Sequence, residues 1–308
     1  MKIFIEVPRW LGDCVMTTPA IENIISSYPK AKLIIFGSFV STRIFANHPN
    51  VERLIVDNSR GGGRYLNLYR YAKEVGKVDL ALSFRRNFST KFLLFFIDSP
   101  QKHYYKRYTK KTLHQVIRYN DFINKSLSKE TTPQNLKIYL KKEIPNPSKP
   151  LLGINAGATY GSAKRWYPQE FAKVAISLSN TYDIILFGGE AEVDIIDDIE
   201  DILIENKITN YQNLAGKTSV DELIEKISTL SLFITNDSGP MHIAGAFSIP
   251  TISIFGPTKY KETNQWQNPN ETIIRKELDC SPCMKRVCPL SHHNCMKEIT
   301  ASDVLGRV

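Results

Sequence analysis

The sequence predicts an α/β protein with two doubly wound domains in tandem, and three observations support this prediction. Short β-rich runs alternate with helical periodicity along most of the 308 residues. The chain is long enough for two domains of ordinary size. A polar segment with three prolines, 135–150, has the composition of a linker. We place the boundary near Asn146, which gives domains 1–146 and 147–308.

The first half contains four β-rich runs, which we predict as strands at 2–7, 32–36, 51–56 and 78–84. After Lys32, the second run is wholly apolar, as expected for a parallel strand buried on both faces. Residues with helical spacing occur at 14–27, 42–46 and 66–75, and again at 109–123. Strand and helix in alternation predict parallel βαβ units.

The alternation resumes in the second half, where we predict strands at 151–155, 183–187, 232–235 and 251–255. The predicted helices are 168–178, 191–206, 220–229 and 240–247. In doubly wound sheets, ligands bind beyond the carboxyl ends of the strands. We therefore expect two such domains to face each other across a cleft that holds the site.

The turn between strand 232–235 and helix 240–247 is the central candidate for that site. Asp237, Ser238 and Gly239 form a tight polar turn, and Pro240 suits the first turn of a helix. A strand, a glycine turn and a helix start expose free backbone N–H groups, which favour an anion. The alternative is a well-capped βα turn without a ligand.

Two further strand ends carry acidic residues. Asp13 follows Gly12 after the first strand, where it either caps the next helix or acts as a general base on a substrate hydroxyl. Glu190 follows Gly188 and Gly189, where an acid can accept hydrogen bonds from ribose hydroxyls. A plain turn with an acid in the first helical turn is the alternative for Glu190.

The loop 155–168 combines small residues with two cations. Small residues let a backbone approach a diphosphate closely, and Thr159 or Ser162 adds a hydroxyl. Lys164 and Arg165 follow as cations that can neutralise phosphate oxygens. The glycine spacing does not match a P-loop. A flexible loop with a surface Lys-Arg pair is the alternative.

The net charge of +9 indicates an acidic partner, which could be nucleic acid, an anionic membrane surface or a phosphorylated substrate. Segment 102–118 carries six Lys and Arg residues and no acid, mixed with tyrosines and histidines. A solvated basic face is the alternative. The longest apolar run, 92–97, is too short to span a bilayer, and the amino terminus lacks a signal-peptide pattern, so we expect a cytoplasmic protein.

Four of the five cysteines lie within sixteen residues, at Cys280, Cys283, Cys288 and Cys295. A reducing compartment disfavours disulfides, and four thiolates so close together suggest a tetrahedral structural zinc site. The spacing differs from the usual pair of Cys-x2-Cys knuckles. A reduced, metal-free cluster that packs a C-terminal loop is the alternative.

These motifs, taken together and in order, resemble the ADP-heptose:lipopolysaccharide heptosyltransferase family. The resemblance is carried by 11–13, 157–158, 164–168, 188–190 and 236–242, and the run from Cys280 to Met296 is most similar to the heptosyltransferase II branch. It implies the GT-B architecture of two Rossmann-like domains. It also implies inverting transfer of L-glycero-D-manno-heptose from ADP-heptose to the inner core of lipopolysaccharide, with no metal or other cofactor in the reaction.

The resemblance also assigns roles to residues. It makes Asp13 the base and places Lys164 on the donor diphosphate. The implied donor-binding residues are Thr159, Glu190, Thr218, Asp237, Ser238, Gly239 and His242. Arginines on the first domain, Arg60, Arg64, Arg85 and Arg86, are expected to meet the anionic acceptor, which is the Kdo-lipid A inner core.

Several functions remain open from the sequence. We expect a peripheral enzyme on the cytoplasmic face of the inner membrane that does not bind nucleic acid. Another nucleotide sugar or another acceptor position would suit the same fold. A nucleotide-binding regulator or a nucleic-acid-binding protein would need neither the Asp13 turn nor the Asp237 turn for catalysis, and the nucleic-acid protein would show strongly salt-dependent binding.

Overall fold

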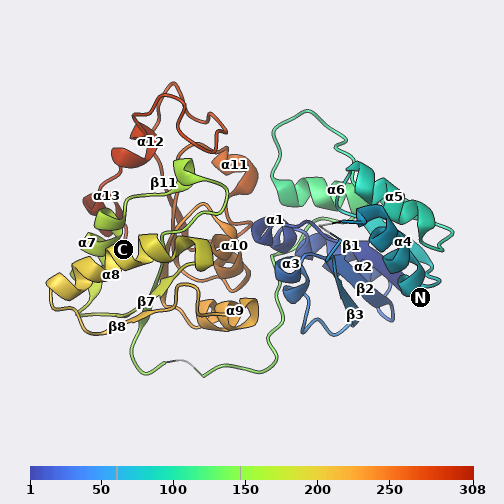
Figure 1. Cartoon of the computed structure of the whole chain (residues 1–308), viewed down its shortest axis with the longest axis horizontal. Helices are drawn as coiled ribbons and strands as arrows, with labels where there is room; N and C mark the ends of the chain where they lie inside the picture. Colours follow the sequence, from blue (N-terminus) through green and yellow to red (C-terminus); the bar gives the residue numbers. More distant parts are fainter. Residues whose placement is uncertain (60–61, 146) are drawn as a thin grey trace. The chain divides into compact units, whose positions relative to one another are not determined.

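The computed structural model describes residues 1–59, 62–145 and 147–308, which form two compact units, Met1–Lys141 and Lys142–Val308. Figure 1 shows the helices and strands of both units. The boundary predicted at Asn146 falls on a residue outside the described ranges. Among the described residues, each unit is built on one sheet whose strands all run parallel.

The N-terminal unit contains a five-stranded sheet in the order β3-β2-β1-β4-β5. Its described strands are β1 (Lys2–Glu6), β2 (Lys32–Gly37), β3 (Val51–Val56), β4 (Leu80–Ser83) and β5 (Lys102–Tyr104). Its described helices are α1 (Leu11–Val15), α2 (Thr18–Ser27), α3 (Phe39–Arg43), α4 (Arg64–Val75), α5 (Phe88–Phe96) and α6 (Gln115–Leu127). The strand order reverses between β1 and β4, where ligands of such sheets bind.

The C-terminal unit contains a six-stranded sheet in the order β11-β10-β9-β6-β7-β8. Its described strands are β6 (Leu151–Asn155), β7 (Asp183–Phe187), β8 (Tyr211–Asn213), β9 (Leu232–Asn236), β10 (Thr251–Ile254) and β11 (Glu271–Ile274). Its described helices are α7 (Pro168–Leu178), α8 (Val193–Glu205), α9 (Val220–Ser228), α10 (Gly239–Ala246), α11 (Tyr260–Thr263), α12 (Asn294–Lys297) and α13 (Ala301–Leu305), with 3-10 turns η1 (Ser162–Lys164) and η2 (Glu190–Glu192). The order reverses between β6 and β9.

Successive side chains of a strand point to opposite faces of the sheet, and apolar side chains on a covered face form the hydrophobic core of each unit. In the N-terminal unit, Phe4 and Phe36 lie on the sheet face that packs against α4 and α5, through Leu68 and Leu93. In the C-terminal unit, strand residues of β6, β7 and β9 pack against α7, α8 and the segment around Met296. Within the part of the chain that the structure describes, no helix is both long and apolar enough to cross a membrane.

Most predicted elements are confirmed, and the differences have local causes. The predicted helix 14–27 is divided into α1 and α2, because Pro19 lies in the first turn of α2. The predicted helix 109–123 begins only at Gln115, where the His114 side chain accepts a hydrogen bond from the Val116 N–H and caps it. The short helix predicted at 42–46 lies earlier, at α3 (Phe39–Arg43). Four helices, α5, α11, α12 and α13, and the short strands β5, β8 and β11 were not predicted from the sequence.

Candidate functional site

The candidate anion site lies where β6 and β9 end side by side. Asn155 closes β6 and pairs with Thr235 of β9 across the sheet. The Asn155 Nδ2 group donates to Thr235 Oγ1 at 3.2 Å and to Ser238 Oγ at 3.0 Å. One buried amide thus joins the ends of both strands to the N-cap of α10.

Lys164 reaches the same turn from the loop after β6. Its Nζ lies 2.7 Å from Asp237 Oδ2 and donates to the Asp237 carbonyl oxygen at 3.2 Å. Thr258 Oγ1 donates to the Asp237 carboxylate oxygen Oδ2 at 2.6 Å. Both charged side chains are largely buried, so the pair is held in a low-dielectric setting. The structure therefore brings Lys164 and Asp237 together, which their separation in sequence did not show.

The start of α10 completes this group. Ser238 is the N-cap, Gly239 begins the helix, and His242 is buried one turn later. The first turn of a helix leaves backbone N–H groups without partners inside the helix, and Lys164 contacts Asp237 directly before this turn. The arrangement can stabilise a negatively charged group by backbone donors and one cation.

A second group of predicted residues lies at the ends of β7 and β8. Glu190 begins η2 and is exposed, and Thr218 is partly exposed in the turn after β8. The two turns contact each other, because the Gly216 N–H donates to the Gly188 carbonyl at 2.9 Å. Thr159 is exposed in the loop after β6. All these segments follow carboxyl ends of strands in the same sheet.

Glu192 connects the two groups and was missed by the sequence analysis. It is buried, and its carboxylate accepts a hydrogen bond from the Gly189 N–H at 2.9 Å. The same carboxylate lies against Gly157 after β6, where a Cβ atom would overlap it. The Gly-Gly-Glu pattern predicted Glu190 as the functional acid, whereas the buried acid is Glu192, two residues later.

In the N-terminal unit, Asp13 lies in the first turn of α1 and is partly exposed. Its negative charge adds to burial in raising the pKa of the Cys14 thiol and of the Tyr119 phenol, so both groups lie near it. The Asp13 carboxylate therefore lies at the N-terminal end of α1, which carries a partial positive charge. It also lies near the buried Tyr119 of α6.

The predicted acceptor arginines are placed differently from one another. Arg85 Nη1 donates to Glu6 Oε1 at 2.8 Å in a largely buried ion pair at the ends of β1 and β4. Burial raises the pKa of Glu6 although Arg85 and a hydrogen bond from Ser83 oppose the shift. Arg86 is exposed, and Arg64 donates to Ser89 Oγ at 3.0 Å. Arg60 lies outside the described residues.

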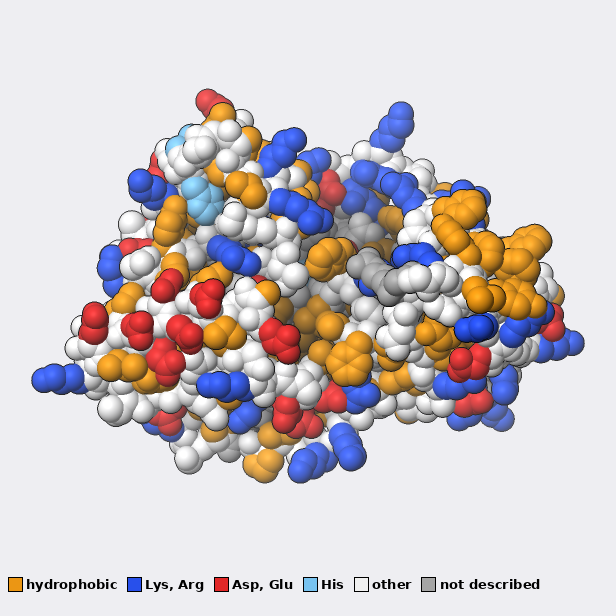
Figure 2. Space-filling model, viewed as in Figure 1, with side chains coloured by type: hydrophobic (Ala, Val, Ile, Leu, Met, Phe, Trp, Pro, Cys, Tyr) orange, Lys and Arg blue, Asp and Glu red, His pale blue; other side chains and the backbone are white. Residues whose placement is uncertain are grey.

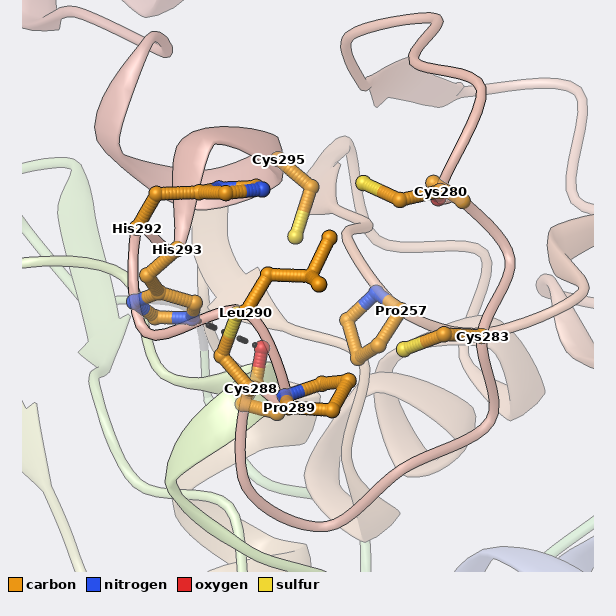
Figure 3. Close-up of a pocket in the computed structure, with 11 residues that line it drawn as sticks. Pro257, Cys280, Cys283, Cys288, Pro289, Leu290, His292, His293 and Cys295 are labelled. Carbon is orange, nitrogen blue, oxygen red and sulfur yellow. Dashed lines mark hydrogen bonds between the residues drawn. The ribbon is translucent and has the colours of Figure 1, made fainter.

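The four clustered cysteines are free thiols around one small cavity of about 20 Å³, roughly the room for one water molecule. Figure 3 shows the side chains of Cys280, Cys295 and Leu290 pointing into it. Burial and the three other thiols raise the pKa of Cys295 to about 11. Backbone N–H groups, that of His293 above all, lower the pKa of Cys288.

Among the described residues, no three His, Cys, Asp or Glu side chains are arranged to hold a metal ion. The zinc site suggested by the cysteine spacing is therefore not formed in the structure. The metal-free alternative, a reduced cluster that packs a C-terminal loop, stays a prediction. An apolar side chain, Leu290, points into the cavity that the four thiols line.

This cysteine-rich loop packs on the loop that carries Lys164. The Ala163 N–H donates to the Arg286 carbonyl at 3.0 Å, and His293 Nε2 donates to the Ala163 carbonyl at 3.0 Å. Because that carbonyl can only accept, Nδ1 of the same ring accepts from the Tyr167 hydroxyl at 3.2 Å. The loop thus fixes the residue directly before Lys164.

A family model described as glycosyltransferase family 9 (heptosyltransferase) matches residues 69–294. The lipooligosaccharide heptosyltransferase 2 of Campylobacter jejuni subsp. jejuni serotype O:2 is 42% identical over 311 residues, covering 99% of this chain and 96% of that protein. The lipopolysaccharide heptosyltransferase 2 of Escherichia coli strain K12 is 23% identical, covering 99% and 97%.

Solved structures agree in fold. The E. coli ADP-heptose lps heptosyltransferase II matches with a TM-score of 0.82 at 21% identity, over 100% of this chain and 97% of that one. The E. coli heptosyltransferase WaaC with ADP matches with a TM-score of 0.81 at 16% identity, over 99% and 98%. These likenesses and the two parallel sheets confirm the expected GT-B fold class.

The contact between Gly157 and Glu192 yields a stability prediction. Changing Gly157→Ala should cost about 1–3 kcal/mol, because the new methyl group displaces a buried, hydrogen-bonded carboxylate. Gly189→Ala is the matched control, since the nearest atom to its added methyl is 3.6 Å away. Thermal and urea unfolding measure the change in the free energy of unfolding for both variants.

A double-mutant cycle identifies the cause. In a Glu192→Ala background, Gly157→Ala should cost clearly less than in the wild-type chain, since the overlapping group is gone. Equal costs in both backgrounds would contradict the contact.

Proposed function

The chain belongs to glycosyltransferase family 9 (heptosyltransferase), and we propose that it transfers L-glycero-D-manno-heptose from ADP-heptose to the inner core of lipopolysaccharide, adding heptose II to heptose I. The observation that carries the proposal is the Lys164–Asp237 pair at the start of α10, which suits a diphosphate leaving group. The choice of sugar and acceptor is supported by the names of relatives that match the chain over nearly its whole length.

The donor is proposed to bind along the carboxyl edge of the C-terminal sheet. Lys164 is proposed to meet the diphosphate with its ammonium group, which pairs with the Asp237 carboxylate and donates to the Asp237 carbonyl oxygen in this structure. The Ser238 and Gly239 N–H groups add backbone donors. Thr159 and His242 flank the diphosphate and the sugar, and Asp237 accepts from sugar hydroxyls.

The nucleoside is assigned to the neighbouring strand ends. Glu190 is proposed to accept from the ribose hydroxyls, and the turn with Thr218 to line the base. Two features support this assignment: the hydrogen-bonded contact between the two turns and the exposure of Glu190, which leaves its carboxylate accessible. Glu192 is given a supporting role, since it holds the β7 turn against Gly157.

Transfer with inversion needs one base and no enzyme nucleophile. Asp13 is proposed to take the proton of the acceptor hydroxyl while its oxygen bonds to the anomeric carbon of the donor. The bond from that carbon to the diphosphate breaks in the same step, and ADP leaves with the electron pair. Lys164 and the α10 N–H groups stabilise the charge that develops on the leaving oxygen.

The acceptor is proposed to be the anionic Kdo-lipid A inner core, met by the cations of the N-terminal unit. Arg86 is exposed and Arg64 is partly exposed, and 102–118 adds a basic stretch. Arg85 is proposed to act at this site together with Glu6, its ion-pair partner. An acceptor with a lipid anchor places the enzyme at the cytoplasmic face of the inner membrane.

Changing Asp13→Asn should lower kcat by about a hundred- to ten-thousand-fold, because the base is lost while the size of the side chain is kept. ADP binding should stay near normal, since Asp13 is not assigned to the donor. Turnover with ADP-heptose and a truncated core acceptor, together with calorimetric ADP binding, measures this. Asp98→Asn, an exposed acid of the same unit, is the control. Near-wild-type turnover of the Asp13 variant would remove Asp13 as the base.

Changing Lys164→Gln should lower kcat/KM by about a hundred- to a thousand-fold, because the leaving diphosphate loses its cation. The loss of ADP affinity should be smaller than the loss of kcat, as charge on the leaving oxygen is greatest in the transition state. Lys226→Gln, an exposed lysine on α9, is the matched control. An unchanged kcat would contradict the role.

We further propose that transfer needs no metal, and that any zinc taken up by Cys280, Cys283, Cys288 and Cys295 is structural. The proposal is supported by the Lys164 ammonium, which lies at the start of α10 and can neutralise charge on the leaving diphosphate without a metal. Treatment with a chelator, followed by elemental analysis, should leave kcat/KM within about twofold while the protein stays folded. Loss of activity that magnesium or manganese restores would contradict it.

A further inference from the structure

Helix α5 is apolar on both its faces, which is unusual for a helix on the surface of a sheet. Its inner face packs Leu93 and Leu94 against the core. Its outer face carries Phe88, which is 69% exposed, and Phe95, which is 73% exposed. Lys91 is the only charged residue of the helix. A solvated outer face would be polar, so this face suits an apolar environment.

Helix α4 extends the same surface. Tyr65 contacts Phe88 and Phe92, with ring centroids 5.8 and 5.0 Å apart, and Tyr69 contacts Phe96 at 5.0 Å. We call this surface the aromatic face. It consists of Tyr65, Leu66, Tyr69, Phe88, Phe92, Phe95 and Phe96. Figure 2 shows orange side chains gathered over the region of α4 and α5 at the right of the view.

Cations surround the aromatic face. Lys73 lies 5.4 Å from the Tyr69 ring, and Lys102 donates to the Phe95 carbonyl at 2.9 Å. Between residues 84 and 118 the sequence has nine Lys and Arg residues and one acid, Asp98. Two of these nine cations, Arg85 and Arg118, are largely buried, and Arg85 pairs with Glu6. Rings that can enter the headgroup layer, bordered by Lys and Arg, are the combination that binds anionic bilayers.

We propose that the aromatic face docks the enzyme on an anionic lipid bilayer, with Phe88 and Phe95 entering the interface and the surrounding cations meeting lipid phosphates. The inference rests on the proposed function in one respect, namely that the acceptor is anchored in a membrane. Beyond that function, it identifies which surface of the chain contacts the membrane. Tyr65 and Tyr69 combine an aromatic body with a polar hydroxyl, which suits the headgroup level.

Sedimentation of the full chain with lipid vesicles tests the proposal. The wild-type chain should bind vesicles of phosphatidylcholine with phosphatidylglycerol, bind pure phosphatidylcholine weakly, and lose binding as salt rises. Phe88→Ala with Phe95→Ala should weaken binding by about tenfold or more, because binding scales with the apolar area that is buried. Ile204→Ala, which alters an exposed apolar residue of α8 in the other unit, is the control and should bind as wild type.

Measurements of folding and activity show whether weaker vesicle binding comes from the loss of the aromatic face or from misfolding. Both side chains are exposed, so the double variant should keep the wild-type circular dichroism, melting temperature and turnover on a soluble acceptor. Vesicle binding equal to wild type in the double variant would overturn the proposal. So would a wild-type dimer that becomes monomeric in the variant while neither binds vesicles, which would assign the face to a second copy of the chain.

The two proposals can fail separately. Vesicle binding that depends on Phe88 and Phe95 in a chain that transfers no heptose would keep the aromatic face and reject the proposed function. Heptose transfer by a chain that binds no anionic vesicle would reject the aromatic face alone.

Discussion

The Lys164–Asp237 ion pair is the interaction on which the C-terminal site depends. A buried ammonium needs a partner, and the Asp237 carboxylate supplies one that Thr258 holds in turn. The pair joins the loop after β6 to the start of α10, so that a cation and the helix N-terminus occupy one place. Under the proposed function, a diphosphate would meet a cation and backbone donors that are already in position, which would reduce the reorganisation required in the transition state.

The surrounding loops support this pair from two sides. The Asn155 side chain at the end of β6 donates to Thr235 and Ser238. The Asn236 side-chain oxygen accepts from the Trp166 backbone N–H at 3.0 Å. From the other side, the cysteine-rich loop holds Ala163 through Arg286 and His293. The cluster of thiols is therefore tied to the site by backbone contacts. Its effect on the reaction would be exerted through the position of Lys164.

The N-terminal unit uses the same topology for a different purpose. Its sheet reverses between β1 and β4, where Glu6, Ser83 and Arg85 form a buried network rather than an open anion site. Lys and Arg residues are gathered on exposed segments instead, and the outer faces of α4 and α5 are aromatic. This distribution suits a large, anionic, lipid-linked acceptor better than a small one.

The sequence alone determined the architecture and most of the candidate residues. Buried parallel strands are continuous apolar runs, and the turns after them are marked by glycine and polar residues, so the alternation and the turn at Asp237 could be predicted locally. Strands of three or four residues, such as β5, β8 and β11, are too short for periodicity to reveal. Helix α5 carries apolar residues on every side, so it lacks the amphipathic signal.

Only the tertiary structure decided which polar groups meet. Lys164 and Asp237 are 73 residues apart, and Glu192 and Gly157 are brought together by adjacent strand ends. It also showed that Glu192, and not Glu190, is the buried acid, and that the four cysteines do not form a metal site in the described residues. The physical reason is that propensity and spacing act over a few residues, whereas burial and the direction of a side chain depend on which segments the sheet places side by side.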